Sequence, residues 1–401
     1  MPGAYKNIKD TSLTAQFKIQ KNKKSQEIIG DSDCYFLAWT TTPWTLPANN
    51  GLAVGEKIKY NLIETFNKYT ESKINVIIAE KCIEKFFDSN NLKTSEELIF
   101  DKQNLPYKIL KTFKGKDLIG FDYDQLLTYV KAEKPAFTVV SGDFVTTDEG
   151  TGIVHISLTF GSDDFYVSKK NNLPGIFVKN DKNEDVPIVD KSGKFVKEII
   201  DFAGLQVKAF SDVEGLTTDE QISIKLKKEN KAFDVKKYEH SYPHCWRTDK
   251  PILYYPLESW FINSTKLKDD FINKNKDINW QPESTGTGRF GNWLENLVDW
   301  NLSRSRFWGT PLPIWRTKDG KDEICIGSIN ELKSEIKKSV DLGFMKNNIS
   351  DNIDLHRPFV DEIILASKEG SPMYRETDTV SYTHLRAHET VLDLVCRLLL
   401  E

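Results

Sequence analysis

The sequence predicts an α/β protein of two or more domains, in which a β-rich, barrel-like domain comes before a region of helices and short strands. The 401 residues, of which 39% are hydrophobic, suffice to bury more than one core. Segments rich in β-branched and aromatic residues, bounded by Gly, Asp or Asn, predict strands at 34–40, 74–80, 136–147 and 150–158. Short strands that alternate with turns are typical of a compact barrel with a few helices on its surface.

The chain enters this β domain through residues 1–28, which are polar and lysine-rich apart from an alternating stretch at 13–19 that predicts one strand. Helical segments interrupt the strands at 80–89 and beyond Gly161, where Ser162 is expected to be the N-cap. We place the β domain at 29–238, because from His240 onwards the sequence becomes rich in aromatic residues and prolines.

The second region, 239–380, combines predicted helices with a strand. Helices are predicted over 266–275 and 289–300, and 307–315 predict a strand entered through a proline-containing loop. The second helix has an apolar face that is expected to be buried, formed by Phe290, Trp293, Leu294, Leu297 and Trp300. The last segment, 381–401, is leucine-rich and has no lysine, so we expect it to be a non-native tail.

Charge and cysteine content narrow the classes of protein. A net charge of −4 does not by itself indicate nucleic-acid binding, which would need local lysine patches. The five cysteines are far apart and odd in number, which favours reduced thiols over a disulfide framework. No apolar run approaches the roughly 20 residues of a membrane span. We expect a cytoplasmic protein that does not enter a membrane.

Two motifs that could bind a nucleotide or a metal lack the context that such sites need. Residues 286–291 match G-x-G-x-x-G, but polar sequence with a proline precedes them where a buried strand is required, so helix entry is favoured. His240, His244 and Cys245 invite a zinc interpretation, yet Thr248 stands where C-x-x-C would have its second cysteine. Packing or hydrogen bonding is favoured for these residues, and no metal site is expected.

Residues 38–49, AWTTTPWTLPAN, place four threonines around two prolines and two tryptophans. Threonine and tryptophan favour strands and proline favours turns, so composition alone favours a structural role. A row of hydroxyls at a strand end, stiffened by prolines, could instead orient a water molecule and a ribose.

His155 and Asp164 form a second candidate site. A lone histidine in an apolar strand such as 150–158 is more often a satisfied core residue than a catalytic one. Acidic residues in the first turn of a helix often only complement the helix dipole. Alternatively, the helix N-terminus keeps Asp164 ionised, ready to hold an ammonium group opposite the histidine.

Taken together, these stretches resemble the isoleucyl-tRNA synthetases, a family of class I aminoacyl-tRNA synthetases. The similarity covers residues 3–378 and is most specific in TTTPWTLPAN at 40–49 and SRSRFWGTPLP at 303–313. The segments GTGIVH at 150–155 and GSDD at 161–164 are similar to the family's second editing motif. The resemblance implies a barrel-like editing domain inserted into a Rossmann-type catalytic domain, of which only part is present.

The resemblance also implies a reaction: hydrolysis of valine esterified to the 3′ end of tRNA(Ile). A synthetic site for isoleucine excludes valine poorly, because one missing methylene is worth only about 1–3 kcal/mol. Asp164 is expected to bind the substrate ammonium group, and His155 to line the pocket near the ester without acting as the general base. The other catalytic residues implied are Thr40, Thr41, Thr42 and Thr45, and the substrate-binding residues implied are Trp44 and Asn49.

The sequence departs from the family at several places. Ser157 and Leu158 replace an Ala-Pro pair, and Thr248 replaces a cysteine of zinc-binding members. The H-I-G-H and K-M-S-K-S signatures for ATP are absent, so we expect an internal fragment that needs no cofactor, ATP and Mg²⁺ serving only the full-length enzyme. We expect a monomer that acts on charged tRNA. The alternative is an editing-inactive fragment that only binds the tRNA acceptor end.

Overall fold

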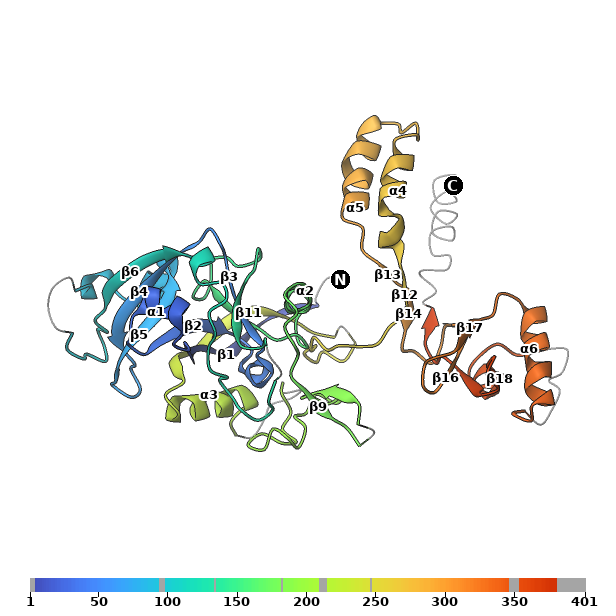
Figure 1. The fold of residues 1–401 in the computed structure, drawn as a ribbon, viewed down its shortest axis with the longest axis horizontal. Helices are drawn as coiled ribbons and strands as arrows, with labels where there is room; N and C mark the ends of the chain where they lie inside the picture. The colour runs from blue at the N-terminus through green and yellow to red at the C-terminus, as the bar shows by residue number, and fades with distance from the viewer. Residues whose placement is uncertain are drawn as a thin grey trace, which may run out of the picture. The chain divides into compact units, whose positions relative to one another are not determined.

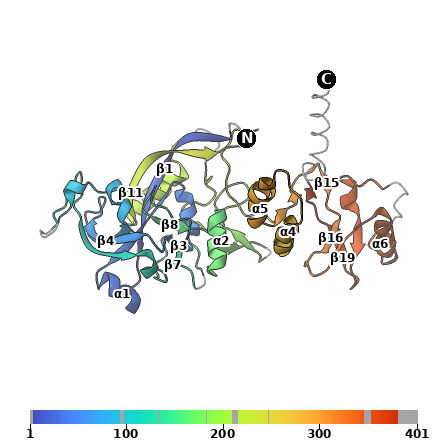
Figure 2. The same ribbon diagram turned by 90° about the horizontal axis from the view of Figure 1, so that it is seen from above.

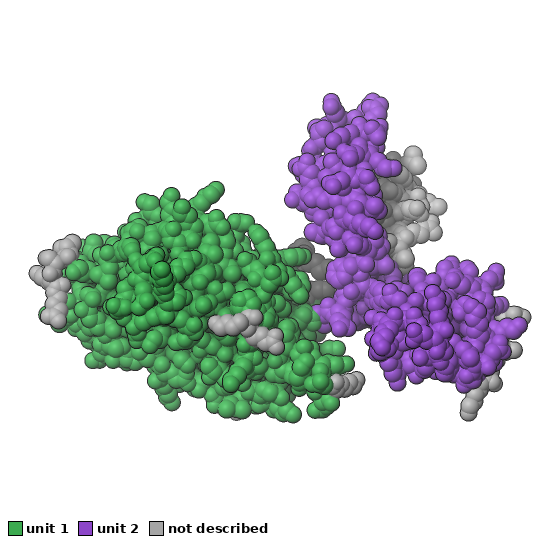
Figure 3. Space-filling model, viewed as in Figure 1, with its two compact units in different colours: residues 1–256 green, residues 257–401 purple. Residues whose placement is uncertain are grey.

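The computed structural model describes residues 4–93, 98–132, 135–181, 183–208, 215–245, 247–345 and 353–380. It divides into two compact units, residues 1–256 and 257–401, shown in different colours in Figure 3. The predicted boundary after residue 238 falls inside a strand that continues to Pro243. The expected non-native tail, 381–401, lies outside the described residues.

The principal sheet of unit 1 has six described strands in the order β11-β1-β2-β5-β4-β6 (Figure 1). Their bounds are β1 Tyr5–Lys18, β2 Cys34–Thr40, β4 Lys59–Phe66, β5 Lys73–Ala79, β6 Lys108–Lys114 and β11 Ala232–Pro243. Strands β2 and β5 are parallel and the other neighbours antiparallel, so the sheet is mixed. Figure 2 shows β1 and β11 running together as one long curved pair.

A second sheet of unit 1 has the order β7-β3-β8, with β3 parallel to β7 and antiparallel to β8. The bounds are β3 Gly51–Val54, β7 Thr138–Ser141 and β8 Ile153–Ile156, and a separate pair consists of β9 Phe177–Lys179 and β10 Asp185–Pro187. One apolar core joins the two main sheets, because inward side chains of β1, β2 and β3 such as Phe17, Phe36 and Leu52 are completely buried together.

Helices cover this core. The α-helices of unit 1 are α1 Lys23–Ile29, α2 Ser162–Lys170 and α3 Thr218–Lys228, and the short 3₁₀ helices are η1 Pro43–Ala48, η2 Glu80–Lys85, η3 Ser89–Asn91 and η4 Gly115–Asp117. The apolar face of α3 packs into the core through Ile222 and Leu226, which are fully buried. The prediction that Ser162 caps α2 is wrong: Gly161 is the N-cap in extended backbone, without a side-chain hydrogen bond, and Ser162 is already helical.

Unit 2 contains short antiparallel strands and three α-helices among its described residues. The helices are η5 Ser264–Leu267, α4 Lys268–Asn275, the π-helical turn η6 Thr285–Phe290, α5 Gly291–Glu295, α6 Ile329–Asp341 and η7 Phe359–Glu362. The strands are β12 Phe261–Ile262, β13 Trp300–Asn301, β14 Ser303–Arg304, β15 Thr310–Pro311, β16 Ile314–Thr317, β17 Glu323–Cys325, β18 Ile364–Ala366, β19 Pro372–Arg375 and β20 Thr379–Val380. All of these pairs are antiparallel, so the described part of unit 2 holds no parallel Rossmann-type sheet.

The predicted apolar helix over 289–300 differs from the structure. The helical segment ends at Glu295, and Trp300 belongs to β13. Trp293 is 58% exposed and Trp300 44% exposed, whereas Leu294 is buried, so the predicted face is only partly covered in unit 2. The α/β class is confirmed. Among the described helices, none combines the length and the apolar character needed to cross a bilayer.

Candidate active site

The threonine run forms a tight turn at the end of β2. Thr40 is the last residue of β2, and η1 begins at Pro43, whose fixed φ suits the first position of a helix. The Thr42 N–H donates to Thr40 Oγ1 over 3.0 Å, and the Thr45 hydroxyl donates to the Thr42 carbonyl over 2.9 Å. Two of the four hydroxyls therefore hold the shape of the turn itself.

His155 lies on β8, opposite Leu52 of β3, with Nε2 3.1 Å from Thr45 Oγ1. Because the one hydroxyl proton of Thr45 goes to the Thr42 carbonyl, the geometry assigns the imidazole proton to Nε2, which donates to Thr45. Nδ1 is then an acceptor, and it has no partner among the described residues. Burial lowers the pKa of His155 to about 4, so the imidazole is neutral at pH 7.

Asp164 lies in the first turn of α2, and its Oδ2 accepts a hydrogen bond of 2.9 Å from the Ser157 N–H. Burial raises the pKa of Asp164 to about 6; the Ser157 hydrogen bond opposes this rise and the neighbouring Asp163 adds to it. The helix N-terminus was expected to keep Asp164 ionised; in the structure burial is the largest influence on its pKa and acts against the ionised form. The carboxyl group is still mostly ionised at pH 7.

One pocket of unit 1 brings four of the predicted residues together. It has a volume of about 350 Å³ and is lined by Thr40, Thr41, His155 and Asp164. Its other lining residues are Trp39, Phe144, Thr146, Glu149 and the segment 150–154. A cavity of this size holds a small ligand, and its lining residues include two with carboxyl groups, Glu149 and Asp164, four threonines and the neutral imidazole of His155.

Thr42 and Thr45 do not line this pocket. Thr45 is only 6% exposed, and its hydroxyl is shared between the Thr42 carbonyl and His155. Thr42 Oγ1 lies 3.2 Å from Thr40 Oγ1. Thr42 and Thr45, which were predicted to contact substrate, in this structure support two residues that line the pocket, Thr40 and His155.

Trp44 and Asn49 also differ from their predicted role as substrate-binding residues. Both are 2% exposed. The Asn49 amide donates to the carbonyls of Gly51 and Ile156, and its Oδ1 accepts from the Tyr123 hydroxyl over 2.8 Å. The Trp44 ring packs against Phe160 with its centroid at 4.9 Å. In this structure neither side chain lines the pocket, and both are packed in the surrounding framework.

Sequence reasoning missed Asp219, the second residue of α3. Its Oδ1 accepts a hydrogen bond of 2.8 Å from the Trp44 N–H, across 175 positions of sequence. An acid in the first turn of a helix has an ordinary explanation as a dipole complement, so no signal in the sequence pointed to Trp44.

Sequence reasoning also missed Trp39 and Glu149, which line the pocket. Trp39 directly precedes the threonine run, and this position in the sequence could have identified it as a pocket residue.

The residues considered for zinc have other partners. His240 Nε2 lies 2.9 Å from Asp10 Oδ2, and His244 Nδ1 lies 2.9 Å from the Tyr242 carbonyl. Within the described ranges, no three His, Cys, Asp or Glu side chains are grouped as metal ligands would be. The G-x-G-x-x-G segment forms the π-helical turn η6 that leads into α5, which confirms its interpretation as a helix entry.

Comparison with known proteins finds relatives among the aminoacyl-tRNA synthetases. Residues 196–359 match the family described as tRNA synthetases class I (I, L, M and V). The isoleucine–tRNA ligase of Cytophaga hutchinsonii is 55% identical over 394 residues, which cover 94% of this chain and 35% of that protein. Those of Bacteroides thetaiotaomicron and Clostridium tetani are 46% and 37% identical, again over 94% of this chain, and 37% and 31% of theirs.

By sequence, the chain is a homologue of the isoleucine–tRNA ligases. It spans about a third of the length of these relatives. Among solved structures it is similar to the editing domain of the cytosolic leucyl-tRNA synthetase of P. knowlesi, at 16% identity and a TM-score of 0.38 over 57% of this chain and 97% of that one. The corresponding domain of P. falciparum gives 13% identity and a TM-score of 0.34, over 58% and 99%.

One departure of this isoleucine–tRNA ligase homologue from the family pattern, Ser157, contacts the pocket residue Asp164. Ser157 stands where the family usually has Ala, and its contact with Asp164 is made by the backbone N–H. Any residue except proline supplies that donor. The replacement at Ser157 therefore keeps the hydrogen bond that orients the Asp164 carboxylate.

Proposed function

We propose that unit 1 hydrolyses the ester of valine misattached to the 3′ end of tRNA(Ile). The observation that carries this proposal is the shared pocket: the Asp164 carboxylate and the side chains of Thr40 and Thr41 line one cavity, together with His155. The sequence homology to isoleucine–tRNA ligases supports the choice of tRNA and amino acid.

Asp164 binds the α-ammonium group of the aminoacyl ester in this proposal. A carboxylate and an ammonium form a charge-assisted hydrogen bond, roughly twice as strong as a neutral one. The Ser157 N–H occupies one carboxylate oxygen, Oδ2, which leaves acceptor capacity for the substrate. Because the pKa of Asp164 is about 6, this site is charged at neutral pH and becomes neutral in mild acid.

The hydroxyls of Thr40 and Thr41 orient the attacking water and the terminal ribose. Water attacks the carbonyl carbon, the bond from that carbon to the ribose oxygen breaks, and the ribose leaves with a proton as its hydroxyl. Positioning supplies most of the rate, since the pocket offers no activated side-chain nucleophile among its lining residues.

His155 acts as a neutral hydrogen-bond partner and not as a strong base. Its Nδ1 is a buried acceptor without a partner in the described part of the chain, and such atoms are uncommon in folded proteins. A water molecule or a ribose hydroxyl in the pocket satisfies it. Its lowered pKa keeps it uncharged across the physiological range, so it does not repel the substrate ammonium.

Several finer features belong to the same proposal. Unit 1 closes into a barrel-like editing domain, and the region beyond it, although its described strand pairs are antiparallel, belongs to a Rossmann-type catalytic domain. Activation of isoleucine, with ATP and Mg²⁺, belongs to the full-length enzyme, and the hydrolysis itself uses no cofactor. The protein works as a monomer in the cytoplasm.

The test compares Asp164→Ala with Asp163→Ala in deacylation of valyl-tRNA(Ile) by the 401-residue chain. Asp163 is the adjacent, exposed carboxylate of the same helical turn, and it does not line the pocket. Loss of Asp164 should slow hydrolysis about 10- to 100-fold, the equivalent of the roughly 1.5–3 kcal/mol of a hydrogen bond to a charged group. Loss of Asp163 should leave it within twofold. Equal rates for the two variants would overturn the proposal.

A second candidate function is binding of the tRNA acceptor end without hydrolysis. The replacement of Ala-Pro by Ser157 and Leu158 favours it, since Ser157 Oγ is buried without a partner among the described residues, in the loop before Asp164. Gel-shift affinity with a steep dependence on salt, together with no deacylation by the unaltered chain, would select this alternative.

A further inference from the structure

We infer that Asp219 is a positioning residue for the proposed hydrolysis: its carboxylate, on α3, caps η1 from outside and fixes the threonine turn against the pocket. This inference rests on the proposed function. Asp219 does not line the pocket, so it acts on the reaction only through the turn.

One backbone N–H in the first turn of η1 needs a hydrogen-bond acceptor from outside the turn. Pro43, the first residue of η1, has no N–H, and the Thr45 N–H already donates to the Thr42 carbonyl over 3.0 Å. Thr42, the N-cap of η1, provides no side-chain acceptor to the helix. The Trp44 N–H is thus the donor of this first turn that requires a partner from elsewhere, and Asp219 Oδ1 accepts it at 2.8 Å in a buried environment.

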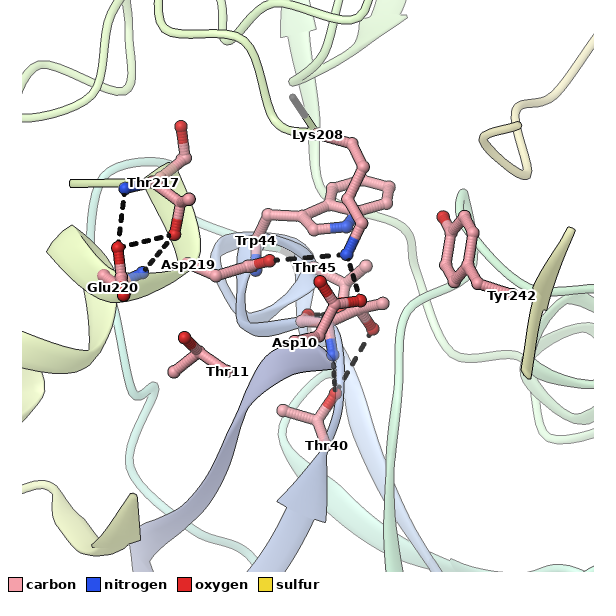
Figure 4. A network of polar contacts seen from close by, with 12 residues as sticks. Asp10, Thr11, Thr40, Trp44, Thr45, Lys208, Thr217, Asp219, Glu220 and Tyr242 are labelled. Carbon is pink, nitrogen blue, oxygen red and sulfur yellow. Dashed lines mark hydrogen bonds and ion pairs between the residues drawn. The ribbon is translucent and has the colours of Figure 1, made fainter. Parts of the chain in front are cut away.

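Asp219 is itself held by a buried polar network, which Figure 4 shows from close by. The ammonium of Lys208 lies between the carboxylates of Asp219 and Asp10, at 3.9 Å from Asp219 Oδ2 and in a direct ion pair with Asp10. Asp10 also accepts from His240 on β11, and Lys208 faces the Tyr242 ring at 4.8 Å. All three charged side chains are less than 20% exposed.

The same residue, Trp44, also connects the turn to the loop that leads to Asp164. Its ring packs edge-on against Phe160, which lies in the loop between β8 and α2 that leads to Asp164. Its backbone is held by α3 through Asp219. The turn is therefore clamped between α3 and the loop that carries the ammonium-binding carboxylate, and a shift of the turn changes the distance between its hydroxyls and that loop.

Release of the cap should impair the chemical step more than substrate binding. Asp164, which binds the ammonium, is held by the Ser157 N–H and not by Asp219. A misplacement of reacting groups by about 1 Å can lower a rate about 100-fold. We therefore expect Asp219→Ala to lower kcat for valyl-tRNA(Ile) hydrolysis about 10- to 100-fold with little change in KM.

The experiment uses the 401-residue chain and the variants Asp219→Ala, Asp219→Asn and Asp234→Ala. Asparagine keeps an acceptor oxygen for the Trp44 N–H, so Asp219→Asn should recover most of the kcat lost in Asp219→Ala. Asp234 is the matched control: it is also a buried carboxylate in ion pairs, with Lys68 and Lys236, and makes no contact with the threonine turn. Its replacement should reduce stability and leave kcat within about twofold.

Hydrogen exchange at the Trp44 amide provides a readout independent of activity. Asp219→Ala should accelerate this exchange at least tenfold, whereas Asp164→Ala should leave it unchanged. Unchanged Trp44 exchange in a folded Asp219→Ala chain overturns the cap, and so does a kcat loss equal to that of Asp234→Ala.

If Asp219→Ala does not fold, the Asp219→Asn chain provides the test. Unaltered kcat and unaltered Trp44 exchange in that chain support the cap, and accelerated exchange overturns it. Absence of hydrolysis by the unaltered chain instead refutes the proposed function.

Discussion

His155 and Thr45 form a buried hydrogen bond of 3.1 Å that joins strand β8 to the threonine turn. The bond fixes the imidazole tautomer with its proton on Nε2, since Thr45 donates its own proton to the Thr42 carbonyl. It also explains why a threonine outside the pocket lies in the same run as the two that line it. One hydroxyl orients the turn and the histidine together.

Replacing Thr45 by Val should therefore impair both stability and hydrolysis. Valine has nearly the shape of threonine but leaves the His155 Nε2–H buried without an acceptor, which costs about 1–3 kcal/mol. We expect a lower free energy of unfolding in urea and slower deacylation of valyl-tRNA(Ile). Thr45→Ser retains the hydroxyl and should stay close to the unaltered chain in both measurements. Equal behaviour of the Val and Ser variants would contradict the role of this hydroxyl.

Hydrolysis should depend on pH through Asp164. The folded-state pKa of its carboxyl group is raised to about 6 by burial, so the group is ionised above pH 6 and protonated below it. Since only the carboxylate attracts the substrate ammonium, KM for the aminoacyl substrate should rise as the pH falls from about 7 to about 5. Deacylation kinetics across this range measure it. Asp163→Ala should keep the profile and Asp164→Asn should flatten it; a steep profile retained by Asp164→Asn would assign the titration to another group.

Much of the fold followed from local patterns. Strand β2, Cys34–Thr40, has the predicted bounds, because the aromatic and other apolar residues of this segment favour a buried strand by their composition alone. The extent of β1 to Tyr5 was not predictable, since the polar residues before Leu13 are ordered by pairing with β11, more than 200 positions away. The exposed faces of Trp293 and Trp300 show the same limit: helical spacing identifies an apolar face but not what covers it.

The residues of the candidate pocket were easier to identify from the sequence than the contacts that each of them makes. Thr40, Thr41, His155 and Asp164 come together as the resemblance implied. Which hydroxyl points into the pocket could not be read from the run, because neighbouring threonines are chemically identical and only the backbone of the turn distinguishes them. Asp219 lay beyond sequence reasoning altogether, as its partner is a backbone N–H and carries no residue-type signal.

The size of the pocket should respond to Thr41. Thr41 lines the cavity, whereas Thr42 and Thr45 lie outside it, so substitutions that test steric exclusion belong at Thr41. A bulkier residue, as in Thr41→Phe, should slow valine release, and Thr41→Ala should begin to admit isoleucine. One methylene of extra room corresponds to about 1–3 kcal/mol, or roughly 10- to 200-fold in relative rate. The ratio of valyl- to isoleucyl-tRNA(Ile) deacylation measures this. An unaltered ratio in Thr41→Ala would place the valyl side chain against another wall.

The stability of the chain should depend on pH through Asp219. Burial raises the pKa of this carboxyl group to about 7, with Lys208 opposing the rise, and a cavity of about 420 Å³ lined by Asp10, Lys208 and Asp219 lets solvent reach it. In the unfolded chain the group ionises near its ordinary value of 3.8. Between these two values the folded state binds more protons than the unfolded state. The free energy of unfolding should therefore fall as the pH rises from about 4 to about 7, by up to about 1.4 kcal/mol per pH unit, and then level off.

Asp219→Asn removes this titration, so the difference in the free energy of unfolding between the Asn variant and the unaltered chain should grow in favour of the variant across that pH range. Urea unfolding at half-unit steps of pH measures the difference. Other charged groups that face this network, Asp10, Lys208, Lys237 and His240, are present in both chains and largely cancel in the comparison. A constant difference from pH 4 to pH 7 would mean that Asp219 is already ionised at the acid end, held there by Lys208 more strongly than burial opposes it.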